Sequence, residues 1–230
     1  MTRPVIAWSY SALNAFENCP RKYWATKVAK KVSDVNQYNM QGNDDHEAIE
    51  HFHKKGLPLP ARLSAQLPLH QKLASTPGEK FIEYSMALRA DFVPTRWNDW
   101  DNVWVRGAGD WININGTLAT YFDWKSGKVR KDIEDQVELT SLLLFAHFPQ
   151  VETVQGGMFY FNHGKIAPHV VHRRDAPRLW NGFISRVREM EQAKLDDNWP
   201  ATPNPLCGWC PYKACPHNTM DARLAREAAE

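Results

Sequence analysis

Long apolar runs are missing from this sequence of 230 residues. No segment approaches the ~18 consecutive apolar residues that a membrane-spanning helix needs. The first residues also lack the apolar central region of a secretory signal peptide. We therefore expect a cytoplasmic protein. Because thiols stay reduced in the cytoplasm, the four cysteines require an explanation other than disulfides.

A large excess of charge of either sign is also absent. The formal net charge is +2, which is compatible with a polyanionic partner but does not by itself indicate one, because dedicated nucleic-acid-binding domains are often more basic. The ATP-binding sequence GxxxxGK followed by Ser or Thr does not occur, so the sequence predicts no ATP-driven motor. Apolar residues are plentiful at 43%, with 10 Trp, 10 Phe and 7 Tyr. We expect one domain spanning residues 1–230 with a sizeable core.

The predicted elements run from helices to strands and then alternate. A helix capped by Ser9 begins the chain and bends at Cys19-Pro20. Strand-forming residues dominate from about residue 79, and Asn115-Gly116 is a strong signal for a hairpin turn. We expect further helices after Gly42 and over 62–74, 133–148, 176–195 and the C-terminus, with strands over 81–88, 103–106, 110–115, 118–125, 151–162 and 165–172. This order indicates an α/β layered domain.

The four cysteines lie in two places along the chain. Cys207, Cys210 and Cys215 are close together near the C-terminus, and Cys19 lies near the other end. A CxxC pair followed by a third cysteine is typical of metal ligands, because adjacent loops can direct thiolates at one centre. Four thiolates could hold zinc or an iron–sulfur cluster, and the spacing does not separate the two. Either centre would join the two ends of the chain through an element made of residues 203–217 and Cys19.

Two aspartates and a lysine flank the predicted hairpin turn. Asp123 and Lys125 are two residues apart, so on a strand their side chains point to the same face. Asp110 lies on the neighbouring strand. Mg²⁺ and Mn²⁺ prefer oxygen ligands, and such an ion activates water for the hydrolysis of a phosphodiester. The lysine can orient that water and contact the phosphate, although Asp-x-Lys alone equally fits a surface ion pair.

A histidine on the predicted second helix adds to this candidate site. His46 and Glu50 share a helix face because they are four residues apart, and histidine is a frequent transition-metal ligand. The alternative is a histidine on the helix surface. The HExxH motif of zinc proteases is excluded, because His46 and His51 are five residues apart.

In their order and spacing, these motifs resemble the RecB-like nucleases of the PD-(D/E)xK superfamily, especially CRISPR-associated exonucleases with an iron–sulfur cluster. The resemblance covers residues 9–216. The matching motifs, in chain order, are Ser9-Tyr10-Ser11, Phe16-Glu17-Asn18-Cys19-Pro20-Arg21-Lys22-Tyr23, Gly42-x-x-x-His46, Gly107-x-x-Asp110, Asp123-Trp124-Lys125-Ser126-Gly127-Lys128, Gln136 and the three C-terminal cysteines.

The resemblance implies a restriction-endonuclease-like core, in which helices flank a central mixed β-sheet. It also implies that Mg²⁺ or Mn²⁺ is held by His46, Asp110, Asp123 and the carbonyl of Trp124. Lys125 would be the catalytic lysine that positions water and stabilises charge.

The resemblance extends to residues outside this central set. Gln136 belongs with the catalytic residues, although the family commonly shows Gln-x-x-x-Tyr and Thr140 stands here at the tyrosine position. Glu83 and Glu50 are interpreted as acids of the outer shell. The four cysteines would hold a 4Fe–4S cluster with a structural role, so the resemblance favours iron–sulfur over zinc.

The implied function is a metal-dependent DNA exonuclease that hydrolyses phosphodiester bonds from single-stranded or duplex ends. It would act in recombination, repair or replication, alone or with a helicase or recombination protein, in a bacterium or a phage. Two other interpretations remain open. The chain could be a non-catalytic or partner-dependent subunit that binds DNA ends, as in CRISPR adaptation, or a zinc-containing DNA-binding module.

Overall fold

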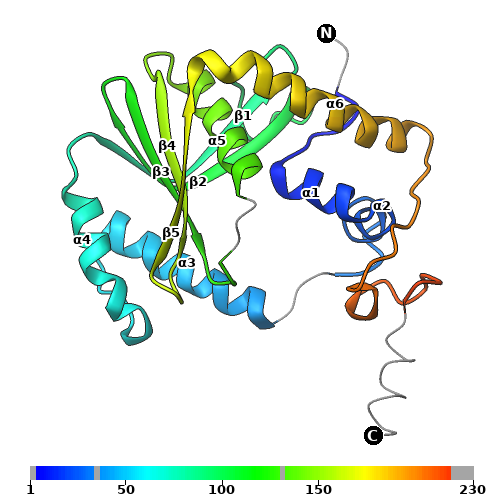
Figure 1. The fold of residues 1–230 in the computed structure, drawn as a ribbon, viewed down its shortest axis with the longest axis horizontal. Helices are drawn as coiled ribbons and strands as arrows, with labels where there is room; N and C mark the ends of the chain where they lie inside the picture. The colour runs from blue at the N-terminus through cyan, green and yellow to red at the C-terminus, as the bar shows by residue number, and fades with distance from the viewer. Residues whose placement is uncertain (1–3, 34–36, 130–132, 219–230) are drawn as a thin grey trace, which may run out of the picture. The chain divides into compact units, whose positions relative to one another are not determined.

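The computed structural model describes residues 4–33, 37–129 and 133–218, and Figure 1 shows the arrangement of their helices and strands. The helix predicted at the C-terminus lies in residues 219–230, outside the described residues. Within the described part of the chain, no helix is both long and apolar enough to cross a membrane.

A mixed five-stranded sheet forms the centre of the fold, in the order β1-β2-β3-β4-β5. Neighbouring strands are antiparallel except for β3 and β4, which are parallel. A parallel pair needs a crossover connection, and helix α5 lies in it. The strands are β1 Glu79–Arg89, β2 Val103–Asn115, β3 Leu118–Lys125, β4 Thr153–Tyr160 and β5 Lys165–His172, and α5 is Glu134–His147. The predicted α/β fold with a central mixed sheet is therefore confirmed.

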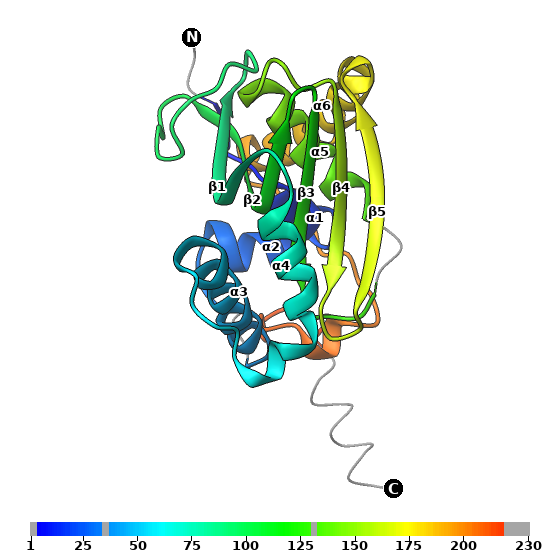
Figure 2. The same ribbon diagram turned by 90° about the vertical axis from the view of Figure 1, so that its left-hand side faces the viewer.

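Helices cover both faces of this sheet (Figure 2). Helices α3 (Gln37–Lys55) and α4 (Leu67–Ser75) lie on one face, and α5 lies on the other. On the α3 and α4 face, a buried cluster joins these helices to the strands through Ile49, Leu63, Leu73, Trp111, Trp124, Phe159 and Phe161. On the other face, glycines of the sheet allow α5 to approach closely. A Cβ at Gly156 would lie 2.6 Å from a methyl carbon of Val137.

The structure corrects two predicted boundaries. The strands predicted at 103–106 and 110–115 form one strand, β2, because the intervening glycines allow close packing and do not break the strand. A Cβ at Gly107 would lie 2.5 Å from a methyl carbon of Leu143 in α5. Helix α3 begins at Gln37, before the predicted start at Gly42, and a Cβ at Gly42 would lie 3.0 Å from Ser126 Oγ.

The predicted hairpin between β2 and β3 is confirmed. Asn115 pairs with Leu118 across the turn. Gly116 has a φ of +60°, which glycine adopts at little cost. This turn sets β2 and β3 in the register that brings their candidate site residues onto neighbouring strands.

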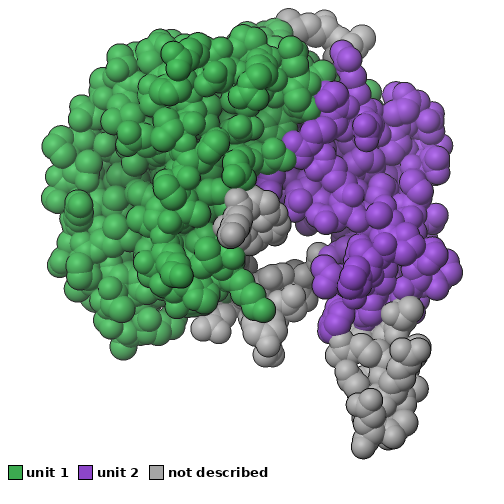
Figure 3. All heavy atoms as spheres, in the orientation of Figure 1, with its two compact units in different colours: residues 1–7, 37–184 green, residues 8–36, 185–230 purple. Residues whose placement is uncertain are grey.

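The chain divides into two compact units, coloured separately in Figure 3. Unit 1 comprises residues 1–7 and 37–184, including the sheet, and unit 2 comprises residues 8–36 and 185–230. Helix α6 (Ala176–Leu195) contributes residues to both units. The expectation of a single domain 1–230, with Cys19 and residues 203–217 as a separate element, stays a prediction.

Unit 2 contains the first helices of the chain. Helix α1 (Tyr10–Asn18) begins as predicted, because the side chain of Ser9 accepts a hydrogen bond from the Ala12 amide at 3.3 Å. The chain is extended at Cys19, and Pro20 then starts the short helix α2 (Pro20–Tyr23). Arg186 forms a bidentate ion pair with Glu17 in this unit. Its Nε and Nη2 donate to the two carboxylate oxygens of Glu17 at 2.5 and 2.8 Å.

Candidate functional site

Three side chains of types that could hold a metal ion meet in unit 1. One ligand atom each from His46 on α3, Glu83 on β1 and Asp110 on β2 lie within 4.8 Å of one another. His46 Nδ1 lies 3.5 Å from Asp110 Oδ2. Asp110 is buried, with 8% of its surface exposed. Two carboxylates and an imidazole at this spacing form a donor set that suits a divalent cation.

Glu83 reaches this group through an unusual backbone conformation. Its φ is +52°, in the left-handed region that residues other than glycine seldom adopt. The residues on either side keep regular pairing with β2, since Ile82 pairs with Trp111 and Tyr84 with Gly109. Such strained residues persist where the surrounding structure enforces them, often at functional sites. We predicted Glu83 in an outer shell, and the structure places its carboxylate beside His46 and Asp110.

Asp123 lies next to this group, with both of its oxygens already engaged. Lys125 Nζ is 2.5 Å from Asp123 Oδ2, and Gln136 Nε2 on α5 donates to Asp123 Oδ1 at 2.8 Å. Asp123 is itself buried, with 7% of its surface exposed. The structure therefore brings the predicted Asp123, Lys125 and Gln136 together, although Asp123 is not among the three side chains that converge within 4.8 Å.

The backbone of Trp124 supports the predicted metal ligands. Its amide donates to Asp110 Oδ2 at 2.7 Å, which fixes one carboxylate oxygen of the group. Burial lowers the pKa of His46, and a hydrogen bond from its imidazole to the Trp124 backbone opposes this effect in small part. The Trp124 side chain is almost fully buried, so the backbone at this position is rigidly placed. The carbonyl of Trp124 remains a predicted ligand.

Burial and mutual repulsion shift the pKa values of the acids. Burial raises the pKa of Asp110 well above its ordinary value, and the charges of Asp123 and Glu83 add to this effect. Burial also raises the pKa of Glu83, with a further contribution from Glu50. Carboxylates in such a site gain most from a bound cation, because the cation offsets both the lost hydration and the repulsion.

The two basic groups of the site are shifted in opposite directions. Burial lowers the pKa of His46, which favours the neutral imidazole that binds metal ions. Burial also lowers the pKa of Lys125, but the charge of Asp123 opposes this effect, and the net pKa is raised. Lys125 is therefore a cation at neutral pH, held beside two carboxylates.

Two predicted residues have local partners. Glu50 accepts a hydrogen bond from Lys54 Nζ at 2.8 Å, one turn along α3, and its charge contributes to the raised pKa of Glu83. Thr140 is buried, and its hydroxyl donates to the backbone carbonyl of Gln136 at 2.9 Å. The hydroxyl of Thr140 thus stabilises its own helix, and no contact with the metal-binding group is seen among the described residues.

One supporting residue was not predicted. Arg62 Nε donates to Asp45 Oδ1 at 2.6 Å, and Asp45 is buried next to His46 in the chain. This ion pair holds the part of α3 that presents the imidazole. No pattern in the sequence connects residues 45 and 62, so only the fold could reveal the pair.

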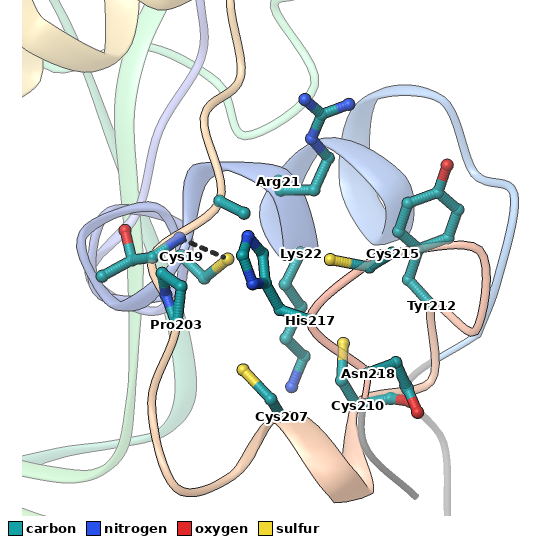
Figure 4. Close-up of a pocket in the computed structure, with 12 residues that line it drawn as sticks. Cys19, Arg21, Lys22, Pro203, Cys207, Cys210, Tyr212, Cys215, His217 and Asn218 are labelled. Atoms are coloured by element: carbon teal, nitrogen blue, oxygen red, sulfur yellow. Dashed lines mark hydrogen bonds between the residues drawn. The ribbon is translucent and has the colours of Figure 1, made fainter. Parts of the chain in front are cut away.

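The four cysteines line one small cavity in unit 2 (Figure 4). Backbone amides donate to two of the sulfurs, from Thr202 to Cys19 Sγ at 3.5 Å and from Asn204 to Cys207 Sγ at 3.3 Å. Among the described residues, however, no three of the sulfurs lie within 4.8 Å of one another. The structure thus brings the predicted cysteines to one cavity without a closed metal-binding geometry, and the four-thiolate centre stays a prediction.

Comparisons with known proteins identify the family of this chain. The family model of the PD-(D/E)XK nuclease superfamily matches residues 7–216. A solved structure from Eubacterium rectale, named "Putative exonuclease", has 11% sequence identity and a TM-score of 0.52, covering 93% of this chain and 91% of that one. The structure of SSO0001 has 14% identity and a TM-score of 0.48, covering 92% and 87%. No curated protein matches. The chain belongs to the PD-(D/E)XK nuclease superfamily.

Proposed function

We propose that this chain is a Mg²⁺- or Mn²⁺-dependent, RecB-like deoxyribonuclease that hydrolyses phosphodiester bonds from the ends of DNA. The observation that carries this proposal is the group of His46, Glu83 and Asp110, whose ligand atoms lie within 4.8 Å of one another and of which Asp110 is buried. The cation of Lys125 lies beside it, paired with Asp123. Membership of a nuclease superfamily supports the same chemistry.

The donor set fits a divalent cation by its chemistry. Carboxylate oxygens suit both Mg²⁺ and Mn²⁺, while an imidazole nitrogen favours Mn²⁺ over Mg²⁺. A bound ion would neutralise charge on the phosphate and lower the pKa of an attacking water. We assign the holding of this ion to His46, Glu83 and Asp110, with Asp123 and the Trp124 carbonyl at the border of the site.

Lys125 is the group of this chain that would meet the substrate. Its pKa is raised by Asp123, so its ammonium remains charged and can donate to an oxygen of the scissile phosphate and to the attacking water. Gln136 holds Asp123 in place through its side-chain amide. This arrangement keeps the ammonium at a fixed position as negative charge develops during the reaction.

We also infer that the four cysteines hold a structural 4Fe–4S cluster. All four cysteines line one cavity, so they can belong to a single centre, and four thiolates suit zinc or a 4Fe–4S cluster. The resemblance to nucleases with an iron–sulfur cluster favours the cluster over zinc. Backbone amides directed at two of the sulfurs are suited to thiolate acceptors.

One observation favours a second candidate function. Thr140 occupies the position of the tyrosine that relatives commonly carry, and its hydroxyl is used within its own helix. A weakened site would suit a partner-dependent subunit that binds DNA ends. The partner would be a helicase or recombination protein that exposes those ends.

The test uses anaerobically purified protein with end-labelled single-stranded DNA, linear duplex and closed circular DNA, in Mg²⁺ or Mn²⁺. Asp110→Asn and Lys125→Ala serve as site variants, and absorbance near 400 nm reports the cluster, about where iron–sulfur proteins absorb. We expect the wild type to degrade linear DNA, the circles to survive, and both variants to be inactive. Intact linear DNA with the cluster loaded would replace the nuclease proposal with the end-binding one.

A further inference from the structure

A second surface of unit 1 presents aromatic side chains that the proposed chemistry does not use. The connection between β1 and β2, residues 90–102, carries Trp97 and Trp100, with 40% and 55% of their surfaces exposed. The guanidinium of Arg106, on β2, lies over both indole rings, at 4.8 Å from the centroid of Trp97 and 4.5 Å from that of Trp100. We call these three side chains the Trp–Arg stack.

No acid within residues 4–33, 37–129 and 133–218 pairs with the charge of this arginine. Among the described residues, Arg106 has no carboxylate partner in an ion pair, and desolvation alone lowers its pKa. Two acids of the connection are occupied elsewhere, since Asp91 pairs with Arg89 and Asp99 accepts from Thr95 and Asn102. The planar edge of the Arg106 guanidinium is therefore available to a phosphate, while its face rests on indole.

The connection is held in one conformation by its own hydrogen bonds. Thr95 N donates to Ala87 O at 2.9 Å, and Val103 N donates to Asp99 O at 2.7 Å. Phe92 anchors its other end, with ring centroids 4.7 Å from Trp180 and 6.0 Å from Trp104. The two exposed indoles are thus presented without a large loss of conformational entropy on binding, which favours a recognition surface.

We propose that the Trp–Arg stack binds the unpaired bases of a single DNA strand, which makes single-stranded DNA ends the substrate of this chain. Exposed aromatic rings stack on bases of any sequence, and an arginine beside them meets the backbone phosphate. Arg106 and Asp110 lie four residues apart on β2, which corresponds to about 13 Å along a strand. A strand held at the stack would therefore extend towards the metal-binding group. This inference rests on the proposed nuclease function.

The test is binding of a fluorescein-labelled oligo-dT to the full chain, carried out in a Lys125→Ala background so that no cleavage occurs. An abasic strand of equal length carries the same phosphates without bases. We expect Trp97→Ala and Trp100→Ala each to raise the Kd for oligo-dT about 5- to 150-fold. The Kd for the abasic strand should stay within about twofold. Trp100→Phe should restore most of the affinity, because phenylalanine also stacks.

Val170→Ala is the matched control, because Val170 is a similarly exposed apolar residue on β5, with 50% of its surface exposed. It should leave both Kd values unchanged. Equal losses on the two strands, or no loss on oligo-dT, would overturn the stacking proposal while leaving nuclease activity in place. If the chain with Lys125 intact cleaves no DNA and the Lys125→Ala background binds neither strand, both the nuclease function and the stack proposal fail.

Discussion

The two candidate sites of this chain are built in contrasting ways. The carboxylate group of unit 1 stands on paired strands and a long helix, and its acceptors are fixed by backbone and amide donors. The cysteines of unit 2 come from the end of α1 and from a segment with little regular structure. The first site has its donor atoms converged, and the second has its sulfurs apart. Strand pairing fixes the positions of the side chains on β-strands, whereas side chains on loops are fixed in position mainly by the ligand that they bind.

The most direct test that the two sites act independently is to inactivate one site by mutation and to measure the property assigned to the other. Asp110→Asn removes a negative charge from the metal-binding group while keeping the shape of the side chain. We expect cleavage of linear DNA to fall about 1000-fold or more, as loss of several kcal/mol of charge stabilisation requires. The absorbance of the proposed iron–sulfur cluster and the iron content of the protein should not change. If activity survived, the catalytic centre would lie elsewhere.

The reverse experiment acts on the cysteine cavity. Cys210→Ser should abolish the absorbance and the bound iron, and should lower the melting temperature by about 10 °C, since a structural metal centre contributes several kcal/mol. Limited proteolysis should then cut within residues 185–218 before it cuts the sheet. Ser85→Ala, on an exposed part of β1, is the control. An unchanged absorbance spectrum would show that the cysteines hold no cluster.

The raised pKa values of Asp110 and Glu83 predict how metal binding depends on pH. In the absence of metal, protonation of these acids stabilises the fold, and this contribution is lost as pH rises through their folded-state pKa values. A cation replaces the protons. Mn²⁺ at about 100 times its Kd should therefore raise the melting temperature by roughly 5–10 °C at pH 8, and by less at pH 5. A shift that grew towards acid pH would contradict this assignment.

The smallest expected effect concerns the strained backbone of Glu83. Glu83→Gly relieves a left-handed conformation that costs about 1–2 kcal/mol, so the metal-free protein should melt roughly 2–6 °C higher. Stabilisation by Mn²⁺ should be largely lost in the same variant. Glu79→Gly on the same strand, where the backbone φ is not positive, should lower the melting temperature instead. A lower melting temperature for Glu83→Gly would show that the conformation carries no strain.

Local patterns predicted the part of the site that lies near the hairpin. The Asn115-Gly116 turn, the two-residue spacing of Asp123 and Lys125, and the strand of Asp110 all follow from short-range rules. The fold class followed from the order of helices and strands. In each case the determining residues are neighbours in the chain, so their chemistry alone was sufficient.

The remaining features depend on residues that meet only in the folded chain. Nothing local indicates that Glu83 adopts a positive φ, because the conformation lies between two residues, Ile82 and Tyr84, that are paired with β2. Residues 107–109 lie between two predicted strands, yet they continue β2, and the approach of α5 explains Gly107. The stacking of Arg106 on Trp97 and Trp100 also joins the end of one connection to the following strand. These contacts join residues that are separated in the sequence, so local sequence patterns do not predict them.

Unit 2 is formed by two separate segments of the chain, which affects how the protein can fold during its synthesis on the ribosome. Its first half, residues 8–36, is synthesised before residues 37–184, and its second half follows them. At about 5–20 residues per second, the first half waits roughly 7–30 s for its partner. The sheet of unit 1 emerges during that interval as one uninterrupted stretch and can fold in the meantime. Unit 2 is completed last, so the proposed four-cysteine centre can form only after the final cysteines leave the exit tunnel, with the thiol of Cys19 still reduced.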